Sequence, residues 1–510
     1  MPATVPATGR VFRTVPRDPG IKVARAGLAR SIRVSLALAV GLGLSGCILG
    51  SERPDLNLDM PATYREAPRG QQPDAAVPAV DWWRGFRSSE LTNLMQAAQI
   101  YNLDIAVAIA QIIQADAQVG VSGAPLLPSL TGTATAERIR DAASSGGGGL
   151  GAAGPTTFSQ YNLGLTASYM VDFWGKNRAT LYAAEESASV ARYNREVVTL
   201  TTIVTVANTY FQVLAAQDEL RVAHRNLTAA ERILELIKKQ FAGGTASQLD
   251  LSQQQALVAT VRASIPPLQV TLEQNIAALA LLVARAPANF NVAGGTTSAI
   301  AVPRVTPGMP SELLYQRPDV RQAEALLASS NFSVESARAA FFPQIQLTAQ
   351  TGVQSAALSS LFGPGAWFYT LSAGLTQPLF DGFLLESELK QAKGVQLQNL
   401  QAYRKAVLSA FADVEKALVA LAKFTLQERL QAEAVAASQK AFDVSEAQFR
   451  GGTVNLLTVL QTEQTLFTNE NVLVQVRLSK LLAASSLFQA LGGGWTPQGT
   501  LASLQLPDQN

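Results

Sequence analysis

Apolar positions along most of this chain follow the 3.6-residue period of an α-helix. The longest such stretch runs from Lys176 to Ala242 and contains neither glycine nor proline. As α-helix it would be roughly 100 Å long, and a run of this length is typical of a coiled coil, a helical repeat or a helical tube. Gly243-Gly244 ends it, and a second helical pattern begins after Leu249-Asp250-Leu251.

The same period predicts five further helices. They are expected over about Ser89–Val119, Leu251–Ala284, Pro318–Phe341, Leu384–Arg450, and from beyond Gly451-Gly452 to Leu491. Pro266-Pro267 should kink or interrupt the second of these, because proline lacks the N–H that a helix uses. Gly492-Gly493-Gly494 predicts the start of an exposed tail.

Four segments alternate instead between apolar and polar residues. They are Leu130–Ala136, Leu163–Phe173, Ile345–Val353 and Trp367–Leu375. Alternation places the apolar side chains of a strand on one face. Strands of about ten residues have the length of tilted membrane-spanning strands, although four strands of a soluble sheet would show the same alternation.

A basic segment followed by a short apolar run marks the N-terminus as a leader. The run from Val34 to Leu44 has the length of a signal-peptide core and is too short to span a bilayer. It ends in Leu44-Ser45-Gly46-Cys47, which resembles a bacterial lipobox. We therefore predict that residues 1–46 are a lipoprotein signal peptide and that Cys47 carries a covalent lipid; a buried cysteine after an ordinary signal peptide is the alternative. By the same resemblance, Ile48 in place of aspartate favours sorting to the outer membrane.

Composition removes several classes of function. The chain of 510 residues has a net charge of +2, one cysteine and one histidine. Near neutrality argues against a nucleic-acid partner, and single residues of each kind argue against a disulfide framework, a His/Cys metal site and Cys–His catalysis. No set of nucleophile, base and orienting group can be assembled, so we expect neither an enzyme nor any cofactor besides the lipid on Cys47.

Membrane crossing, if it occurs, must then use the strands. Outside the leader, no run of 18 or more apolar residues exists, so the sequence predicts no transmembrane helix. A crossing chain must therefore form a barrel. Four strands cannot close one, because the smallest single-chain barrels have eight strands. The chain must pool strands with copies of itself, and two, three or four copies are allowed.

The second half of the chain repeats the first. Gln240-Phe241-Ala242-Gly243-Gly244-Thr245 recurs as Gln448-Phe449-Arg450-Gly451-Gly452-Thr453, which is the sign of a duplicated architecture. The predicted boundaries are an extended N-terminal tether at 47–88, a first repeat at 89–286, a linker at 287–316, a second repeat at 317–491 and a C-terminal tail at 492–510.

A set of motifs resembles the outer membrane efflux proteins, that is, the TolC-like and NodT-type lipoproteins. The motifs are Trp82-Trp83, Asp172-Phe173-Trp174-Gly175, the segment from Leu314 to Glu324, the segment from Ala339 to Ile345, and the segment from Gln377 to Gly382. Each motif alone is modest, but their order, spacing and duplication cover nearly all of the chain after residue 55.

The resemblance implies a mixed α/β membrane protein. Three copies would form a twelve-stranded outer-membrane β-barrel, with four strands per chain, continued by a long periplasmic α-helical barrel. The homotrimer would be the exit duct of a tripartite efflux system embedded in outer-membrane lipid. It would passively conduct small molecules such as drugs from a periplasmic adaptor protein and an inner-membrane resistance-nodulation-division pump to the exterior.

The resemblance also implies a gate near the second Gly-Gly turn. The narrowing positions fall on Leu457, Thr458 and Gln461. Many relatives carry aspartate at the last two positions, whereas this chain carries Thr458 and Gln461. A ring of Leu457 and a ring of Gln461 would therefore constrict by size and dewetting.

A latch for the closed tip is implied at Asp250. Its usual aromatic hydroxyl partner aligns with Phe449, which neither donates nor accepts a hydrogen bond, so another donor such as Arg450 would be needed. For all these tip residues, ordinary helix packing and solvation is the alternative.

Two other functions stay open. The exit duct of a type I protein secretion system shares the fold, and a structural coiled-coil lipoprotein without a channel would show the same long helices. The lipobox, Trp82-Trp83 and Arg317-Pro318-Asp319 favour the efflux duct.

Overall fold

The computed structural model describes residues 79–140, 157–303 and 313–495. These residues belong to one compact unit, Arg53–Asn510. The predicted signal peptide, Cys47 and Ile48 lie outside the described residues and remain predictions. At the end of the predicted tether, Trp82–Phe86 forms a short 3-10 helix, η1.

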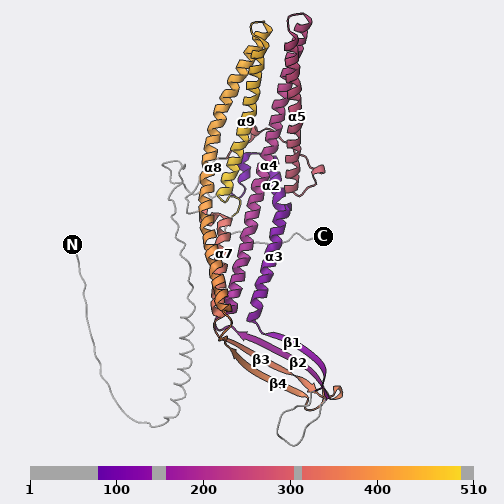
Figure 1. The fold of residues 1–510 in the computed structure, drawn as a ribbon, viewed down its shortest axis with the longest axis vertical. Helices are drawn as coiled ribbons and strands as arrows, with labels where there is room; N and C mark the ends of the chain where they lie inside the picture. The colour runs from indigo at the N-terminus through magenta and orange to yellow at the C-terminus, as the bar shows by residue number, and fades with distance from the viewer. Residues whose placement is uncertain (1–78, 141–156, 304–312, 496–510) are drawn as a thin grey trace, which may run out of the picture. The chain divides into compact units, whose positions relative to one another are not determined.

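Long helices and one sheet make up the described chain. The helices are α2 (Ser89–Tyr101), α3 (Leu103–Gly123), α4 (Lys176–Ala242), α5 (Gln248–Leu282), α6 (Leu313–Gln316), α7 (Pro318–Ala339), α8 (Leu384–Arg450) and α9 (Leu456–Ala490). Short 3-10 helices lie at Ala124–Leu126 (η2), Pro287–Asn289 (η3), Thr297–Ala299 (η4) and Leu358–Ser360 (η6). The turns that join α4 to α5 and α8 to α9 lie at the end of the helices farthest from the sheet (Figure 1).

The two longest helices begin and end where the sequence predicts. Each has 67 residues, and each return helix, α5 or α9, has 35. The predicted interruption of α5 is wrong, because the helix continues through Pro266 and Pro267. The carbonyls of Arg262 and Ala263, which lose their helical donors, belong to exposed residues where water can satisfy them.

The helix predicted over Ser89–Val119 is divided in two at Asn102. The Asn102 side chain accepts hydrogen bonds from the amides of Asp104 and Ile105, at 2.9 and 3.1 Å, and so caps the start of α3. This local cap overrides an apolar period that continues through the break.

Within the described residues, two stretches have the length and composition of a membrane-spanning helix, although neither is an uninterrupted apolar run. They are Ser89–Leu126 and Lys176–Ala242. Length and composition alone are weak evidence for a span, because a core helix passes the same test. In the second stretch, 61% of the apolar window is buried within the chain, whereas in the first the figure is 17%.

The strands form one antiparallel sheet in the order β1-β2-β3-β4. Their bounds are Ser129–Arg140, Thr157–Val171, Gln344–Ser355 and Trp367–Thr376. The register aligns Leu130, Ala167, Ala349 and Leu371 in one row, and Thr131, Thr166, Gln350 and Thr370 in the next. Because neighbouring rows point to opposite faces, the predicted alternation gives the sheet one apolar and one polar face.

Two end-to-end joints connect short helices to return helices. The side-chain amide of Asn102 donates a hydrogen bond through Nδ2 to the carbonyl of Leu282, at 2.9 Å, so the start of α3 meets the end of α5. In the same way, Arg317 Nη1 donates to the carbonyl of Ala490, at 3.2 Å, so the start of α7 meets the end of α9. The buried Arg317 also pairs with Asp319, which explains the Arg317-Pro318-Asp319 motif as a helix joint.

The Trp82-Trp83 motif lies in the largest hydrophobic cluster. Trp82 stacks on Phe488 of α9 with ring centroids 4.7 Å apart, and Phe86 packs against Phe211 of α4 at 5.1 Å. Both tryptophans are buried. The motif therefore fixes the start of the described chain to α4 and α9.

The predicted exposed tail does not begin at Gly492. Gly492, with φ of +70°, ends α9, and the chain then packs back onto the helices. Trp495 is only 6% exposed, and its indole nitrogen donates to the carbonyl of Gln316. Residues 492–495 therefore belong to the packed part of the chain, because the hydrogen bond from Trp495 holds them against α6.

We predict that Gly352→Ala destabilises the sheet by about 1–3 kcal/mol, because overpacking forces the backbone apart. A Cβ at Gly352 would lie 2.7 Å from the Cα of Gly164 on β2 and would also meet the carbonyl of Leu163. Gly374→Ala on β4 is the matched control, since nothing lies within 4 Å of its Cβ. Urea unfolding measures the difference, and equal midpoints for the two variants would contradict the prediction.

Candidate functional site

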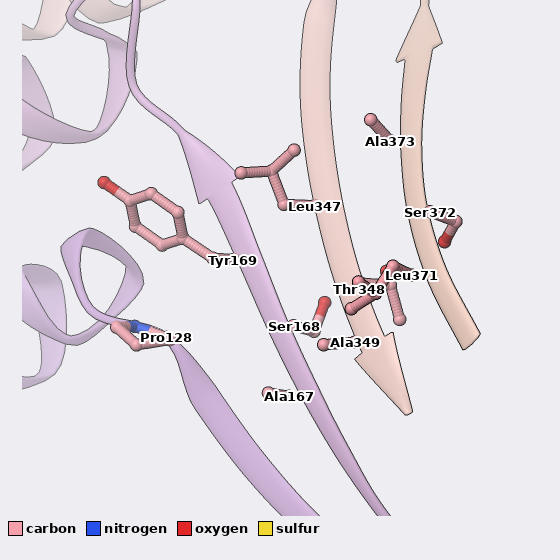
Figure 2. A pocket seen from close by; sticks show the side chains of 10 residues that line it. All are labelled: Pro128, Ala167, Ser168, Tyr169, Leu347, Thr348, Ala349, Leu371, Ser372 and Ala373. Carbon is pink, nitrogen blue, oxygen red and sulfur yellow. The ribbon is translucent and has the colours of Figure 1, made fainter. Parts of the chain in front are cut away.

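The sheet carries a shallow hollow on its apolar face. It measures about 420 Å³ and is lined mainly by small and apolar side chains, Ala167, Tyr169, Leu347, Ala349 and Leu371 among them (Figure 2). None of its lining residues is acidic, basic, histidine or cysteine. This composition suits contact with an apolar surrounding.

The described residues also offer no metal centre. Nowhere in ranges 79–140, 157–303 and 313–495 do three or more His, Cys, Asp or Glu side chains gather in a way that could hold an ion. The candidate site that remains is the pair of helix turns, where the sequence predicts the gate.

The two turns are built alike. Gly244 and Gly452 both have positive φ, +74° and +70°, which glycine adopts without strain. The amide of Thr245 donates to the carbonyl of Gln240 at 2.8 Å, and the amide of Thr453 to that of Gln448 at 3.0 Å. The repeated Gln-Phe-x-Gly-Gly-Thr motif thus encodes one turn geometry twice.

The caps of the return helices differ between the turns. Ser247 and Asp250 form a capping box at the start of α5, in which the Ser247 amide donates to the Asp250 carboxylate at 2.9 Å. Hydrogen bonds from the Ser247 hydroxyl and amide lower the pKa of Asp250 below its usual value. In the second turn, Asn455 caps α9, and Thr458 donates its hydroxyl to Asn455 at 2.9 Å. The first cap is charged and the second is neutral.

The predicted narrowing residues lie on an open face of α9. Leu457 is 54% exposed, Gln461 is exposed and Thr458 is half-buried. Leu457 and Gln461 are four residues apart and so share one face of the helix. Gln461 also lines a shallow groove of about 630 Å³ with Leu257 of α5.

The structure does not bring the predicted latch residues together. The Asp250 carboxylate binds Ser247 within its own cap, and Arg450 Nη2 donates instead to Glu446 Oε1 at 2.6 Å. Phe449 packs on the apolar cluster of the tip. We call this the tip cluster, and its buried members are Ile233, Ile237, Phe442, Leu456, Val459 and Leu466.

Two buried carboxylates at the tip, Glu446 and Glu463, were not predicted from the sequence. Glu446 of α8 is only 9% exposed and accepts a hydrogen bond from Arg232 of α4 at 2.7 Å, which ties the two helix pairs together. Its partner lies 214 positions away, so no local motif marks it. Glu463 of α9 is 3% exposed. The sequence could have indicated its burial, because Glu463 lies four residues after Val459, at a position where the helical period expects an apolar residue.

Most of the chain is similar in sequence to known outer membrane proteins. The sequence profile of the family described as outer membrane efflux protein matches residues 94–285 and 309–493. The pyoverdine export outer membrane protein OpmQ of Pseudomonas aeruginosa is 37% identical over 444 residues, which cover 86% of this chain and 92% of that protein. The probable outer membrane lipoprotein SilC of Salmonella typhimurium is 29% identical, over 84% of this chain and 95% of its own.

Solved structures share the fold. The open state of the MtrE outer membrane channel of Neisseria gonorrhoeae superposes with a TM-score of 0.75 and is 27% identical. The match covers 88% of this chain and 98% of that one. The described fold is therefore that of an outer-membrane channel.

We predict that Arg232→Gln loosens the tip by about 1 kcal/mol, because it removes the ion pair with Glu446 between α4 and α8. Lys238→Gln is the matched control, since Lys238 pairs with Glu235 inside α4 itself. Limited proteolysis at the two Gly-Gly turns measures the loosening. Equal cleavage rates in the two variants would show that the pair does not join the helices.

Proposed function

This chain belongs to the outer membrane efflux protein family, and we propose that three copies of it form the exit duct of a tripartite efflux system. As an outer-membrane efflux channel it moves molecules and does not convert them. The observation that carries the assembly of several copies is the sheet, which has two contrasting faces and two edges without a partner strand among the described residues.

The edges argue for assembly with copies of the chain. β1 pairs only with β2, and β4 only with β3, within the described sheet. An open edge is not viable in lipid, because its amides and carbonyls find no water. Pairing β4 of one copy with β1 of the next satisfies both edges. Three copies of the four-stranded sheet would give a twelve-stranded barrel, the number that the family resemblance favours over two or four copies.

The faces of the sheet suit such a barrel. Leu130, Leu371 and their row fit lipid outside, whereas Thr131, Gln350 and their row fit a water-filled lumen. Helices α4, α5, α8 and α9 would continue this lumen as a helical barrel through the periplasm. Molecules would pass along it without chemical change.

Two copies of one architecture would supply the walls. We propose the repeats at 89–286 and 317–491, joined by the linker at 287–316. The equal lengths of α4 and α8, and of α5 and α9, support this division. The two separate segments matched by the family profile support it as well.

A lipid on Cys47 would anchor the duct to the membrane. The motif ending in Cys47, the following Ile48 and the name of the lipoprotein SilC support this proposal. Cleavage would then remove residues 1–46 and leave 47–88 as a lipidated tether leading to η1. We propose no other cofactor.

The duct would receive its cargo from partners in the cell envelope. We propose a periplasmic adaptor protein and an inner-membrane pump of the resistance-nodulation-division class. The cargo would be small molecules such as drugs. Because OpmQ is named for pyoverdine export, a secreted metabolite of that kind is the first candidate.

The resting duct would be closed at the second turn. We propose that Leu457, Thr458 and Gln461 narrow the lumen, since Leu457 and Gln461 lie exposed on one face of α9. In the proposed latch, Glu446 would bind Arg450 of its own helix and Arg232 of the other helix pair, and so hold the two pairs together. Asp250 and Phe449 would support the tip by capping and packing.

The gate predicts that Leu457→Ser with Gln461→Ala raises the resting conductance of the reconstituted protein severalfold, because two constricting rings become wider and more polar. Planar-bilayer recording measures it. Leu249→Ser with Gln253→Ala is the matched control, because Leu249 and Gln253 occupy the equivalent positions of the first turn. An unchanged conductance, or an equal rise in the control, would place the gate elsewhere.

The efflux role predicts that cells lacking this chain retain small molecules. Susceptibility to drugs and the yield of secreted pyoverdine-like metabolites should both be measured. We expect at least one of them to change and to be restored by the wild-type chain. Loss of a secreted protein with both small-molecule readouts unchanged would instead favour type I protein secretion.

A further inference from the structure

Glu463 is a buried acid without a partner at the helix tip. It lies four residues after Val459 and three before Leu466, on the stripe of α9 that enters the tip cluster. The residue is 3% exposed, and neither carboxylate oxygen has a hydrogen-bond partner within the described structure. Buried carboxylates are normally paired, so this one calls for an explanation.

The charged groups around Glu463 do not neutralise it. Glu446 faces it from α8, and Arg232 faces it from α4. Arg232 and Arg450 both bind Glu446, at 2.7 and 2.6 Å, and form no ion pair with Glu463. From α5 the fully buried polar group of this region is Gln254, which is uncharged and donates to the carbonyl of Ala230 on α4.

This environment favours the protonated acid. Burial, and next the nearby Glu446 carboxylate, raise the pKa of Glu463 to about 7, against a smaller opposing effect of Arg232. An unburied glutamate has a pKa near 4.5. The packed tip therefore binds this proton on the order of 300-fold more tightly than a tip in which Glu463 reaches water.

We propose that Glu463 is a proton-binding switch that holds the tip packed when protonated and loosens α9 from α4 and α8 when ionised. An ionised Glu463 must either stay buried beside Glu446 or gain water by separating the helices. The second course moves α9 away from α8 and would break the hydrogen bond, 2.6 Å long, between the hydroxyls of Thr462 on α9 and Ser445 on α8.

The switch would act on the gate that we propose at Leu457 and Gln461, and its effect on conduction rests on that proposal. Gln461 lies two residues before Glu463 on the same helix, so a shift of α9 displaces both.

The direction of the pH dependence follows from the linkage between proton binding and stability. The stabilisation of the packed tip is fully present below a pH of about 4.5 and is lost as the pH rises through about 7. Resting conductance should therefore rise between acidic and slightly alkaline pH.

The test compares the assembled wild-type protein with Glu463→Gln, which keeps the shape of the side chain and cannot ionise. Two readouts are taken from pH 5 to pH 8: protease cleavage at the Gly-Gly turns and single-channel conductance. Because the rate of the protease itself varies with pH, cleavage is expressed relative to the variant at each pH. We expect the wild-type ratio to rise about tenfold or more across this range and the resting conductance of the wild type alone to rise.

Two further variants keep the test sharp. Glu463→Met removes the charge with an apolar side chain of similar length and should behave like Glu463→Gln. Glu235→Gln is the control, since Glu235 is an exposed acid of α4 near the same tip. It should keep the pH response of the wild type.

The outcomes separate the switch from the gate. A cleavage ratio that is flat from pH 5 to pH 8 overturns the switch. If the cleavage ratio rises with pH while the conductance stays constant, the proton site is supported and its coupling to the gate is overturned. Absence of current from every variant contradicts the proposed channel assembly, while the cleavage ratio still decides whether Glu463 titrates in the tip.

Discussion

The backbone of an edge strand must find hydrogen-bond partners, and this requirement governs the whole chain. Four strands leave two open edges, which water can satisfy and lipid cannot. The apolar face of the sheet makes water an unsuitable surrounding, and this is why we propose that other copies of the chain meet the edges. In the proposed assembly, closing the barrel at the sheet would also place the long helices of the copies in one ring.

Local signals predicted the elements, and distant partners decided what could not be predicted. The long helices end at Ala242 and Arg450 because paired glycines stop a helix whatever surrounds it. Asn102 shows two local signals in conflict, a cap and an apolar period, and the cap prevails. The buried end at Trp495 and the pairing of Arg232 with Glu446 depend on residues far away in the sequence. Periodicity carries no information about such partners.

The two turns at the tip share a backbone geometry but differ in their side chains. Both turns keep the same backbone geometry, yet the first return helix starts with a carboxylate in its cap and the second with a neutral pair. The second return helix also carries the buried acid Glu463, whereas Gln255 stands at the equivalent distance after the first turn. If the two halves arose by duplication, substitutions at these few positions would have made the second turn the more responsive to its surroundings.

The two end-to-end joints would set the bore of the proposed duct. Near the sheet, α4 is flanked by α3 and α7, and α7 also contacts α8; toward the tip, α5 and α9 take over these two places. Asn102 and Arg317 join each succeeding pair of helices at their ends. Within the described residues, α3 with α5, α4, α7 with α9, and α8 then form four helical columns from the sheet to the tip, and the short α2 packs beside α4 in addition. A tube assembled from such chains can keep one circumference along its length and needs no taper except at its mouth.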